Sequence, residues 1–332
     1  MMDRRTFVSR VVSCLCAAPL AANAQPAGKV YRIGLLANAT RRPDAEFRQS
    51  PWFLALRDLG WVEGQNVVFE RRGTDGNTEL LPQLARELVA AKVDLIATFS
   101  SIDAAGAKQA TSTVPIVMIF SGLDPVEEGF VKSFARPGGS ITGVSRMLGE
   151  TDAKRLGLIK EMLPAASRIG VLANANIDPD QQAKFEKRMR AAAHGLSVEL
   201  QFFGFKSQAD VEAAFPLMAD KRVQAFVLEP QFFTFKNRDR IAELAIKHRL
   251  PGAFTLKEYA VAGGLMSYGP DWPMLERQHA GYVDRILRGA RPGDLPIEQP
   301  TKFNLAINLK SAKALGITIP QSVLLRADEL IQ

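Results

Sequence analysis

The sequence predicts an α/β protein with two doubly wound parallel-sheet lobes and a ligand cleft between them. Two observations indicate this fold class: a set of short apolar strands that occurs twice in the same order, and segments of helical periodicity between those strands. The length of 332 residues also fits two domains, because single domains commonly hold about 100–200 residues. With 47% hydrophobic and 23% charged residues, the composition is that of a globular protein.

The repeated strands are the strongest of these signals. Residues Arg32–Asn38 (RIGLLAN) recur as Arg168–Asn174 (RIGVLAN). Two further pairs follow in the same order: Val93–Thr98 with Val223–Leu228, and Val114–Ile119 with Leu250–Phe254. Unbroken apolar runs of this length are typical of strands that are buried on both faces of a parallel sheet. We interpret the shared order as a duplication, with a chance likeness between buried strands as the alternative.

Segments with helical periodicity lie between the strands. Apolar residues of Leu80–Val89 recur at the spacing of one helix face, and Phe185–Ala193 and Ile241–Ile246 show a similar pattern. Strands that alternate with helices predict βαβ crossovers and therefore parallel sheets. We expect the first lobe to span residues 29–143 with about 263–291 returning to it, and the second to span residues 144–262 with about 292–332 returning to it.

The first 24 residues have the features of an export signal. Three arginines precede an apolar run and a small-x-small cleavage site: Arg4, Arg5 and Arg10, then Val11–Leu20, then Ala22-Asn23-Ala24. We therefore expect a mature periplasmic protein that begins at Gln25. The adjacent arginines leave both a twin-arginine route and an ordinary Sec route open. Cys14 ends a weak lipoprotein-type sequence, so lipidation of Cys14 is a further alternative.

The residue types that common catalytic and metal sites need are missing from the predicted mature chain. Both cysteines, Cys14 and Cys16, lie in the export signal, which excludes thiolate catalysis and cysteine-based metal sites. The histidines are not spaced as metal ligands, and no nucleophile-elbow or dinucleotide-binding motif occurs. Gly138–Gly143 has the glycine spacing of a phosphate-binding loop, but Val144 replaces the required lysine, so a turn-rich connector is predicted. We predict no enzyme and no cofactor, with an exported enzyme of similar fold as a rival interpretation.

Candidate ligand-binding residues follow the predicted strands. Ligands of doubly wound sheets bind outside the carboxyl ends of the strands, so two facing lobes would present two sets of loops to one cleft. These loops begin at Asn38, Ser100, Ser121, Asn174 and Glu229. Asn38 and Asn174 are equivalent residues of the duplicated strand, and each can donate and accept hydrogen bonds. A role in the turn alone is the alternative for both asparagines.

Ser100 and Ser101 precede the predicted helical segment Ala104–Ala110. The first turn of a helix has free backbone N–H groups, which together with serine hydroxyls can bind a carboxylate. A plain helix cap is the alternative, and the two roles are compatible. Tyr268, on a predicted strand that returns toward the cleft, is a candidate for stacking on a ligand or for hydrogen bonding to it.

Longer segments carry a family resemblance. They are Leu56–Asn66, Ala107–Val117, Ala135–Gly143, Ala262–Gly269, and Glu298–Phe303 followed by Asn308–Gly316. These segments resemble the ABC transporter substrate-binding proteins that include the tryptophan- and tyrosine-type binding proteins of bacteria, from about residue 30 to the C-terminus. The resemblance implies a type I periplasmic-binding fold with three crossing segments and a ligand between the lobes. It also implies an ABC permease and its ATPase as partners.

The resemblance also bears on two of the candidate residues. Asp124 and Pro125 match an Asp-Pro pair of the family, so Asp124 is a candidate to receive a ligand ammonium group; capping of the segment from Pro125 is the alternative. Glu229-Pro230 stands where relatives often show a Pro-Asp-type sequence, so the polar ligand contact on that side departs from the family pattern.

These features together predict the periplasmic solute-binding component of an ABC-type importer. It would capture a small organic solute, with an amino acid or an aromatic carboxylate favoured. A ligand-sensing periplasmic protein of the same fold, which presents its ligand to a receptor, is the alternative. The formal net charge of +7 is dispersed along the sequence, so we expect no nucleic-acid partner. We expect the protein to be a monomer.

Overall fold

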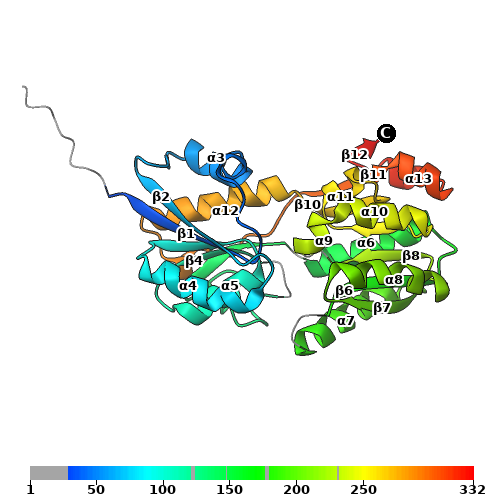
Figure 1. Cartoon of the computed structure of the whole chain (residues 1–332), viewed down its shortest axis with the longest axis horizontal. Coiled ribbons are helices and arrows are strands. Elements are labelled where there is room, and N and C mark those ends of the chain that lie inside the picture. Colours follow the sequence, from blue (N-terminus) through cyan, green and yellow to red (C-terminus); the bar gives the residue numbers. More distant parts are fainter. Residues whose placement is uncertain (1–28, 121–123, 147, 176–178, 230–231) are drawn as a thin grey trace, which may run out of the picture.

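The structure, a computed structural model, describes residues 29–120, 124–146, 148–175, 179–229 and 232–332. These residues form two α/β lobes that lie side by side (Figure 1). The predicted export signal, residues 1–24, and the candidate Ser121 lie outside the described residues. Among the helices in this part of the chain, none combines the length and the hydrophobicity that crossing a membrane requires.

The first lobe is built on a five-stranded parallel sheet with the order β2-β1-β3-β4-β5. Its strands are β1 (Tyr31–Ala37), β2 (Val67–Gly73), β3 (Leu95–Thr98), β4 (Ile116–Phe120) and β5 (Ile141–Ser145). The helices of its N-terminal part are α2 (Asp44–Phe47), α3 (Pro51–Asp58), the 3-10 helix η1 (Thr78–Leu80), α4 (Leu81–Ala90) and α5 (Ser101–Ala110). Strands β3 and β4 are buried over their full length, as unbroken apolar runs predict. β5 is also fully buried, although the sequence predicts a turn-rich connector over Gly138–Gly143.

The second lobe carries a seven-stranded sheet with the order β12-β11-β10-β9-β8-β6-β7, in which only the β10–β11 pair is antiparallel. Its strands are β6 (Arg168–Asn174), β7 (Glu199–Phe205), β8 (Ala225–Leu228), β9 (Gly252–Phe254), β10 (Met266–Pro270), β11 (Phe303–Asn308) and β12 (Glu329–Ile331). Its helices are α6 (Leu148–Met162), α7 (Pro179–His194), α8 (Gln208–Asp220), α9 (Phe232–Lys236), α10 (Arg238–Lys247), α11 (Lys257–Val261), α13 (Leu309–Leu315) and α14 (Gln321–Leu324).

The two sheets share one strand order. The sequence β2-β1-β3-β4-β5 in the first lobe corresponds to β7-β6-β8-β9-β10 in the second. The repeated segments Arg32–Asn38 and Arg168–Asn174 supply β1 and β6, and the other two repeated pairs supply β3 with β8 and β4 with β9. The prediction of two doubly wound lobes is therefore confirmed, and the repeated strands occupy equivalent places in the two sheets.

The described chain passes between the lobes at three places. The first passage lies between β5 and α6 and includes Arg146. The second lies between Pro270, the end of β10, and α12 (Trp272–Leu287), which packs on α3 and β4 of the first lobe. The third follows Glu298, whose carbonyl accepts the Ser145 N–H at 2.8 Å, and leads into β11.

The two returns begin later than the sequence predicts. β10 belongs to the second sheet, so the chain returns to the first lobe only after Pro270 and not near residue 263. The 3-10 helix η2 (Pro292–Asp294) still belongs to the first lobe, because Gly138 donates its N–H to the Gly293 carbonyl at 3.0 Å. The return to the second lobe therefore comes after Glu298, beyond the expected position near 292.

Buried polar contacts fix α12 to the first lobe. His279 is fully buried; it accepts a hydrogen bond from Trp52 Nε1 at 2.8 Å and donates from Nε2 to the Val117 carbonyl at 3.0 Å. Burial lowers the pKa of His279 to about 4, so the imidazole is neutral at neutral pH. These contacts join α3, β4 and α12, and they place Trp272, the first residue of α12, beside the cavity described next.

Candidate ligand-binding cleft

A cavity of about 1200 Å³ lies between the two lobes. Residues at the carboxyl ends of β1, β3, β6 and β8 line it: Asn38, Ser100, Ser101, Asn174 and Glu229. Strand ends of two sheets that face one cavity are the arrangement that the duplicated strands predict. These predicted site residues, from both lobes, are therefore brought together in one place.

Asn38 and Asn174, at the two duplicated strand ends, are held in the same way. In the first lobe the backbone N–H of Asn38 donates to the Asp103 carboxyl at 2.7 Å. In the second lobe the backbone N–H of Asn174 donates to the Glu229 carboxyl at 2.9 Å. Burial raises the pKa of Asp103 and the pKa of Glu229 to about 7 each, because desolvation disfavours the ionised form. Each carboxyl group therefore fixes a strand end and can carry a proton near neutral pH.

Ser100 caps α5, as the sequence predicts. Its side chain accepts the backbone N–H of Asp103 at 3.2 Å, and the helix begins at Ser101. Ser101 is buried and interacts within the protein. The Asp103 carboxyl already occupies the first turn of this helix, and an ionised ligand carboxylate would repel its ionised form. The serines are therefore better suited to neutral polar groups of a ligand than to a carboxylate.

The cavity wall on the second lobe contains a buried group of charged side chains. Asp152 accepts hydrogen bonds from Arg155 and, at 3.2 Å, from Arg188. The Arg155 side chain is only 3% exposed, and it also donates to Thr255 Oγ1 and to the Leu228 carbonyl. A buried arginine needs such partners, because an unpaired charge away from water is costly. These contacts therefore fix the side chains of Asp152 and Arg155, which α6 contributes to the cavity wall.

Arg146 is the first residue after β5, where the chain leaves the first lobe. It lines the cavity, is 7% exposed, and has its guanidinium 5.3 Å from the centroid of a Trp272 ring. Burial, together with the nearby charge of Arg155, lowers the pKa of Arg146 to about 10. Arg146 therefore remains positively charged at neutral pH.

Aromatic side chains cover much of the remaining cavity surface: Phe99, Phe130, Phe185, Phe233, Phe235 and Trp272. Phe99, directly after β3, stacks on His279 with ring centroids 5.1 Å apart, so the buried imidazole fixes its position. Phe233, in the second lobe, packs edge-on against Phe205 at 5.2 Å. Fixed rings combined with a few polar groups are typical of sites for small organic ligands.

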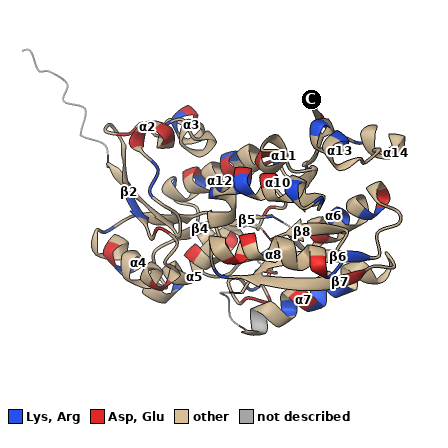
Figure 2. Cartoon of the chain, turned by 45° about the vertical axis from the view of Figure 1, so that its right-hand side comes forward, with Lys and Arg blue, Asp and Glu red and all other residues tan. Residues whose placement is uncertain are grey.

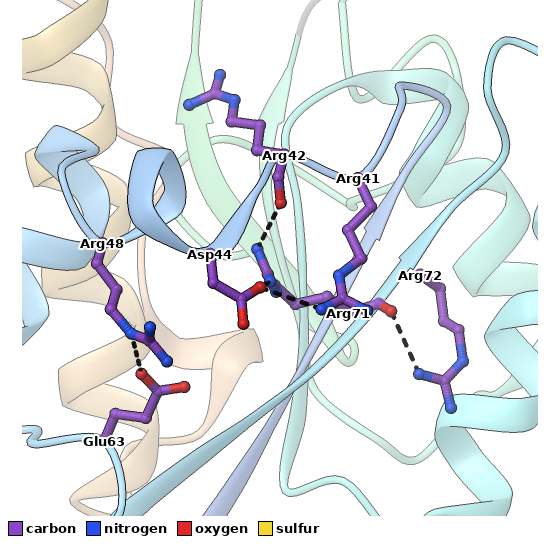
Figure 3. A network of polar contacts seen from close by, with 7 residues as sticks. All are labelled: Arg41, Arg42, Asp44, Arg48, Glu63, Arg71 and Arg72. Carbon is purple, nitrogen blue, oxygen red and sulfur yellow. Dashed lines mark hydrogen bonds and ion pairs between the residues drawn. The ribbon is translucent and has the colours of Figure 1, made fainter.

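An arginine-rich network fixes the segment that follows β1 at the edge of the cavity (Figure 3). Arg41 and Arg71 both bind Asp44, and Arg71 also donates to the backbone carbonyl of Arg42 at 3.1 Å. The Arg71 guanidinium lies 4.3 Å from the ring centroid of Phe47. Because Arg42 lines the cavity, this network places one cationic side chain on the wall of the first lobe.

Asp124 and Tyr268 are predicted site residues that do not line the cavity. Asp124 is exposed, and its carboxylate accepts the Val126 N–H at 2.7 Å, a contact that fits the capping alternative. Tyr268 lies on β10, where it stacks on Phe303 of the neighbouring β11 with ring centroids 5.8 Å apart. A ligand contact of either residue therefore stays a prediction that the cavity lining does not support.

Cavity residues on helices and crossing segments carry little sequence signal. Arg146 follows the buried strand β5, whose first three residues belong to Gly138–Gly143, the segment that the sequence predicts as a turn-rich connector. Because no strand was predicted before Arg146, the strand-end signal that identified Asn38 was lacking there. Asp152 and Arg155 reach the cavity from α6, and nothing in their local sequence distinguishes them from surface charges.

The fold and the cavity define a class of protein, one that holds a small molecule between two α/β lobes. In the described part of the chain, no group of three or more His, Cys, Asp or Glu residues could hold a metal ion. The chain belongs to the family of ABC transporter substrate binding proteins, because the model of that family matches residues 52–331.

Comparisons with individual proteins agree with this assignment. The chain is 25% identical over 294 residues to a tyrosine-binding protein of Clostridioides difficile, covering 87% of this chain and 82% of that protein. A solved ABC domain from Streptococcus pneumoniae in complex with L-Trp has a TM-score of 0.79 at 24% identity, covering 91% of this chain and 99% of that chain. A conserved domain protein from Vibrio cholerae has a TM-score of 0.81 at 26% identity, covering 91% and 100%.

These comparisons confirm two of the sequence-based predictions. The family is the one that the segments between residue 30 and the C-terminus resemble, and the fold is of the type I periplasmic-binding kind. Because the family consists of substrate-binding proteins, the prediction that the chain is not an enzyme is confirmed as well.

Proposed function

We propose that the protein is the periplasmic solute-binding component of an ABC-type importer, which delivers a small organic solute to a membrane permease. The permease and its ATPase would be its partners, and the protein would act as a monomer without a cofactor. The family assignment supports the role in transport. The export signal predicted in residues 1–24 supports the periplasmic location.

The observation that carries this proposal is the cavity between two equivalent lobes. Its volume of about 1200 Å³ exceeds the ~300–1000 Å³ of typical small-molecule sites, so the lobes have room to approach each other around a ligand. A solute that contacts both walls binds the closed arrangement more tightly than the open one. Only such a difference in affinity can shift the protein toward the closed form that a permease would recognise.

An amino acid or an aromatic carboxylate is the solute that we favour. One relative is named a tyrosine-binding protein, and one similar structure contains L-Trp. In this chain the cavity combines aromatic rings such as Phe99 and Trp272 with acidic and cationic side chains such as Asp103 and Arg146. Charged groups of both signs beside apolar rings suit a ligand that is charged at one end and apolar at the other.

Strand-end residues of both lobes are proposed to contact the solute: Asn38, Ser100, Ser101, Asn174 and Glu229. Their position on both walls of the cavity supports this role. Asn38 and Asn174 line the cavity at equivalent strand ends, and their side chains would contribute to the ligand contacts.

A thermal-shift screen tests the proposed function. The chain from Gln25 onward would be heated with amino acids, aromatic acids, sugars and nucleosides, and hits would be measured by calorimetry. A solute at about 100 times its dissociation constant should stabilise the folded protein by roughly 2.7 kcal/mol. Stabilisation by a small organic solute with one-to-one binding supports the proposal. A well-folded protein that none of these classes stabilises would contradict it.

A further inference from the structure

Arg146 has hydrogen-bonding groups that the protein itself leaves unused. Its Nε and Nη2 atoms are buried, and neither has a hydrogen-bond partner among the described residues. Most buried polar side-chain atoms in folded proteins are hydrogen-bonded, and a buried charge without a partner is especially costly. Arg146 lines the cavity between the lobes, but neighbouring atoms cover these two N–H groups in the ligand-free protein. A molecule held there would therefore pair with them once the guanidinium turns toward the cavity.

The neighbouring acidic groups are already engaged with other partners. Asp152 is shared by Arg155 and Arg188, and the Glu229 carboxyl accepts the Asn174 N–H. Arg188 also lines the cavity, and its Nε and Nη1 atoms likewise lack partners among the described residues. This part of the cavity therefore carries more guanidinium groups than the carboxylates beside them can neutralise.

The two unused atoms of Arg146 lie on one edge of the guanidinium. Nε–H and Nη2–H form the parallel pair of donors that matches the two oxygens of a carboxylate. The Trp272 ring under the guanidinium restrains its orientation. The geometry therefore favours a planar anion that accepts two hydrogen bonds over a single-point acceptor such as a hydroxyl.

We propose that Arg146 is the residue that binds the carboxylate of the transported solute. This inference rests on the proposed solute-binding function and makes it more specific. It places the carboxylate at the first crossing segment and not at the start of α5. Arg146 attracts an anion, whereas Asp103 in its ionised form would repel an anion near Ser100. The aromatic rings beside Arg146 then contact the apolar part of the solute, and the strand-end residues of the first lobe contact its remaining polar groups.

Pairs of probes that differ only in the anionic group test this proposal in the unmodified protein. The pairs are L-tryptophan with L-tryptophanamide, L-tyrosine with L-tyrosinamide, phenylacetate with phenylacetamide, and benzoate with benzamide; D-glucose and adenosine are uncharged probes. We expect at least one acid to bind and its amide to bind at least about 30-fold more weakly, which corresponds to the loss of one buried charge pairing. Equal affinities within each pair that binds would overturn the proposal.

Substitutions of Arg146 test which residue makes the contact. Arg146→Met removes the charge and keeps an apolar stem, so the affinity for the acid should fall by at least about 30-fold. Arg146→Lys keeps the charge but loses the paired donors, and it should retain part of the affinity. Arg190→Met is the matched control, because Arg190 also lies over an aromatic ring, Phe202 at 4.7 Å, but pairs with Glu186 and does not line the cavity. An unchanged affinity in folded Arg146→Met would overturn the assignment.

The melting temperature of the ligand-free protein distinguishes a binding role of Arg146 from a structural role, because the two roles predict changes of opposite sign. If the guanidinium is reserved for a ligand, Arg146→Met should raise the melting temperature of ligand-free protein, by about 2–4 °C. A melting temperature that falls would mean that Arg146 stabilises the fold and would count against the proposal. Binding of D-glucose or adenosine alone would leave the solute-binding function standing and refute the carboxylate site, whereas the absence of any binding would refute both.

Discussion

The two walls of the cavity share a backbone plan but differ in charge. On the first-lobe side, including α12, the lining charges are mostly acidic: Asp75, Asp103, Glu128 and Glu276 against Arg42. On the second-lobe side, including the first crossing segment, they are mostly cationic: Arg146, Arg155, Arg188, Lys206 and Lys236 against Asp152, Glu229 and Glu258. Figure 2 shows Lys, Arg, Asp and Glu residues interspersed on helices of both lobes.

This comparison separates what duplication preserves from what binding requires. The shared features are contacts that fix the backbone. In each lobe a carboxyl group accepts the backbone N–H of the strand-end asparagine, Asn38 in the first and Asn174 in the second. The charged side chains that differ lie at positions the repeated strands do not include, such as Arg146 and Arg155. A solute with unlike ends would therefore have one preferred orientation, with its anionic end toward Arg146.

The largest expected effect concerns the buried charges of the second-lobe wall. Arg155→Met leaves Asp152 with Arg188 alone and removes the bonds to Thr255 and Leu228. Removing one partner of a buried ion pair costs about 3–5 kcal/mol, so the free energy of unfolding in urea should fall by that amount. Arg291→Met, in an exposed pair with Asp294, should change it by less than about 1 kcal/mol. Equal losses of unfolding free energy in Arg155→Met and Arg291→Met would contradict the view that the buried charges preorganise this wall.

The next effect concerns the two carboxyls at the strand ends and depends on pH. The pKa of folded Asp103 is about 7, above its ordinary value of 3.8, so the folded protein binds more protons than the unfolded chain between these pH values. The stability from this group is therefore greatest below pH 3.8 and is lost as the pH rises through 7. Asp103→Asn lacks this dependence of stability on pH. Its free energy of unfolding, measured relative to that of the unmodified protein, should therefore increase by about 2–4 kcal/mol between pH 4 and pH 8.

Glu229→Gln sharpens the comparison between the lobes. The pKa of Glu229 is raised in the same direction, from 4.5 to about 7, so its stability contribution is also lost as the pH rises through 7. The shift is smaller and Glu229 is less buried than Asp103, so the pH-dependent gain should be smaller. Urea unfolding of both variants at several pH values measures this. If stability depended on pH with opposite sign in the two variants, the two strand-end carboxyl groups would not be equivalent.

The smallest expected effect concerns the serines at the start of α5. Replacing Ser100 and Ser101 by alanine removes a helix cap, at about 1 kcal/mol of stability, and removes neutral hydroxyl contacts to the solute. Neutral hydrogen bonds contribute about 0.5–1.5 kcal/mol, so calorimetry should show affinity weakened about 2- to 12-fold, less than for Arg146→Met. A loss of affinity larger than that of Arg146→Met would indicate that the serines, and not Arg146, bind the carboxylate.

The fold was largely predictable because its signal is local. Strands such as Arg32–Asn38 are buried on both faces and appear as unbroken apolar runs, and their repetition marked the two lobes. Boundaries near 263 and 292 were less accurate, because assigning β10 to a sheet depends on its neighbours β9 and β11 and not on its own residues.

The site was predictable only where it follows the repeated strands. Asn38 and Asn174 were found because a strand end in a doubly wound sheet has a known relation to the ligand. Tyr268 does not line the cavity, because the face of a strand that a side chain occupies depends on packing, here on Phe303. Arg146 and Arg155 were missed because burial of a charged residue is a tertiary property that the sequence does not display.

Movement of the two lobes toward each other around the solute is the central expectation. The chain from Gln25 contains no cysteine, so spin labels can be placed at one exposed position in each lobe, Glu79→Cys and Ala209→Cys. A pair within the first lobe, Glu79→Cys with Arg57→Cys, is the control. Pulsed electron–electron double resonance should show a shorter interlobe distance and a narrower distance distribution with saturating solute, while the control distance stays constant. An interlobe distribution that does not change on binding would contradict capture between closing lobes.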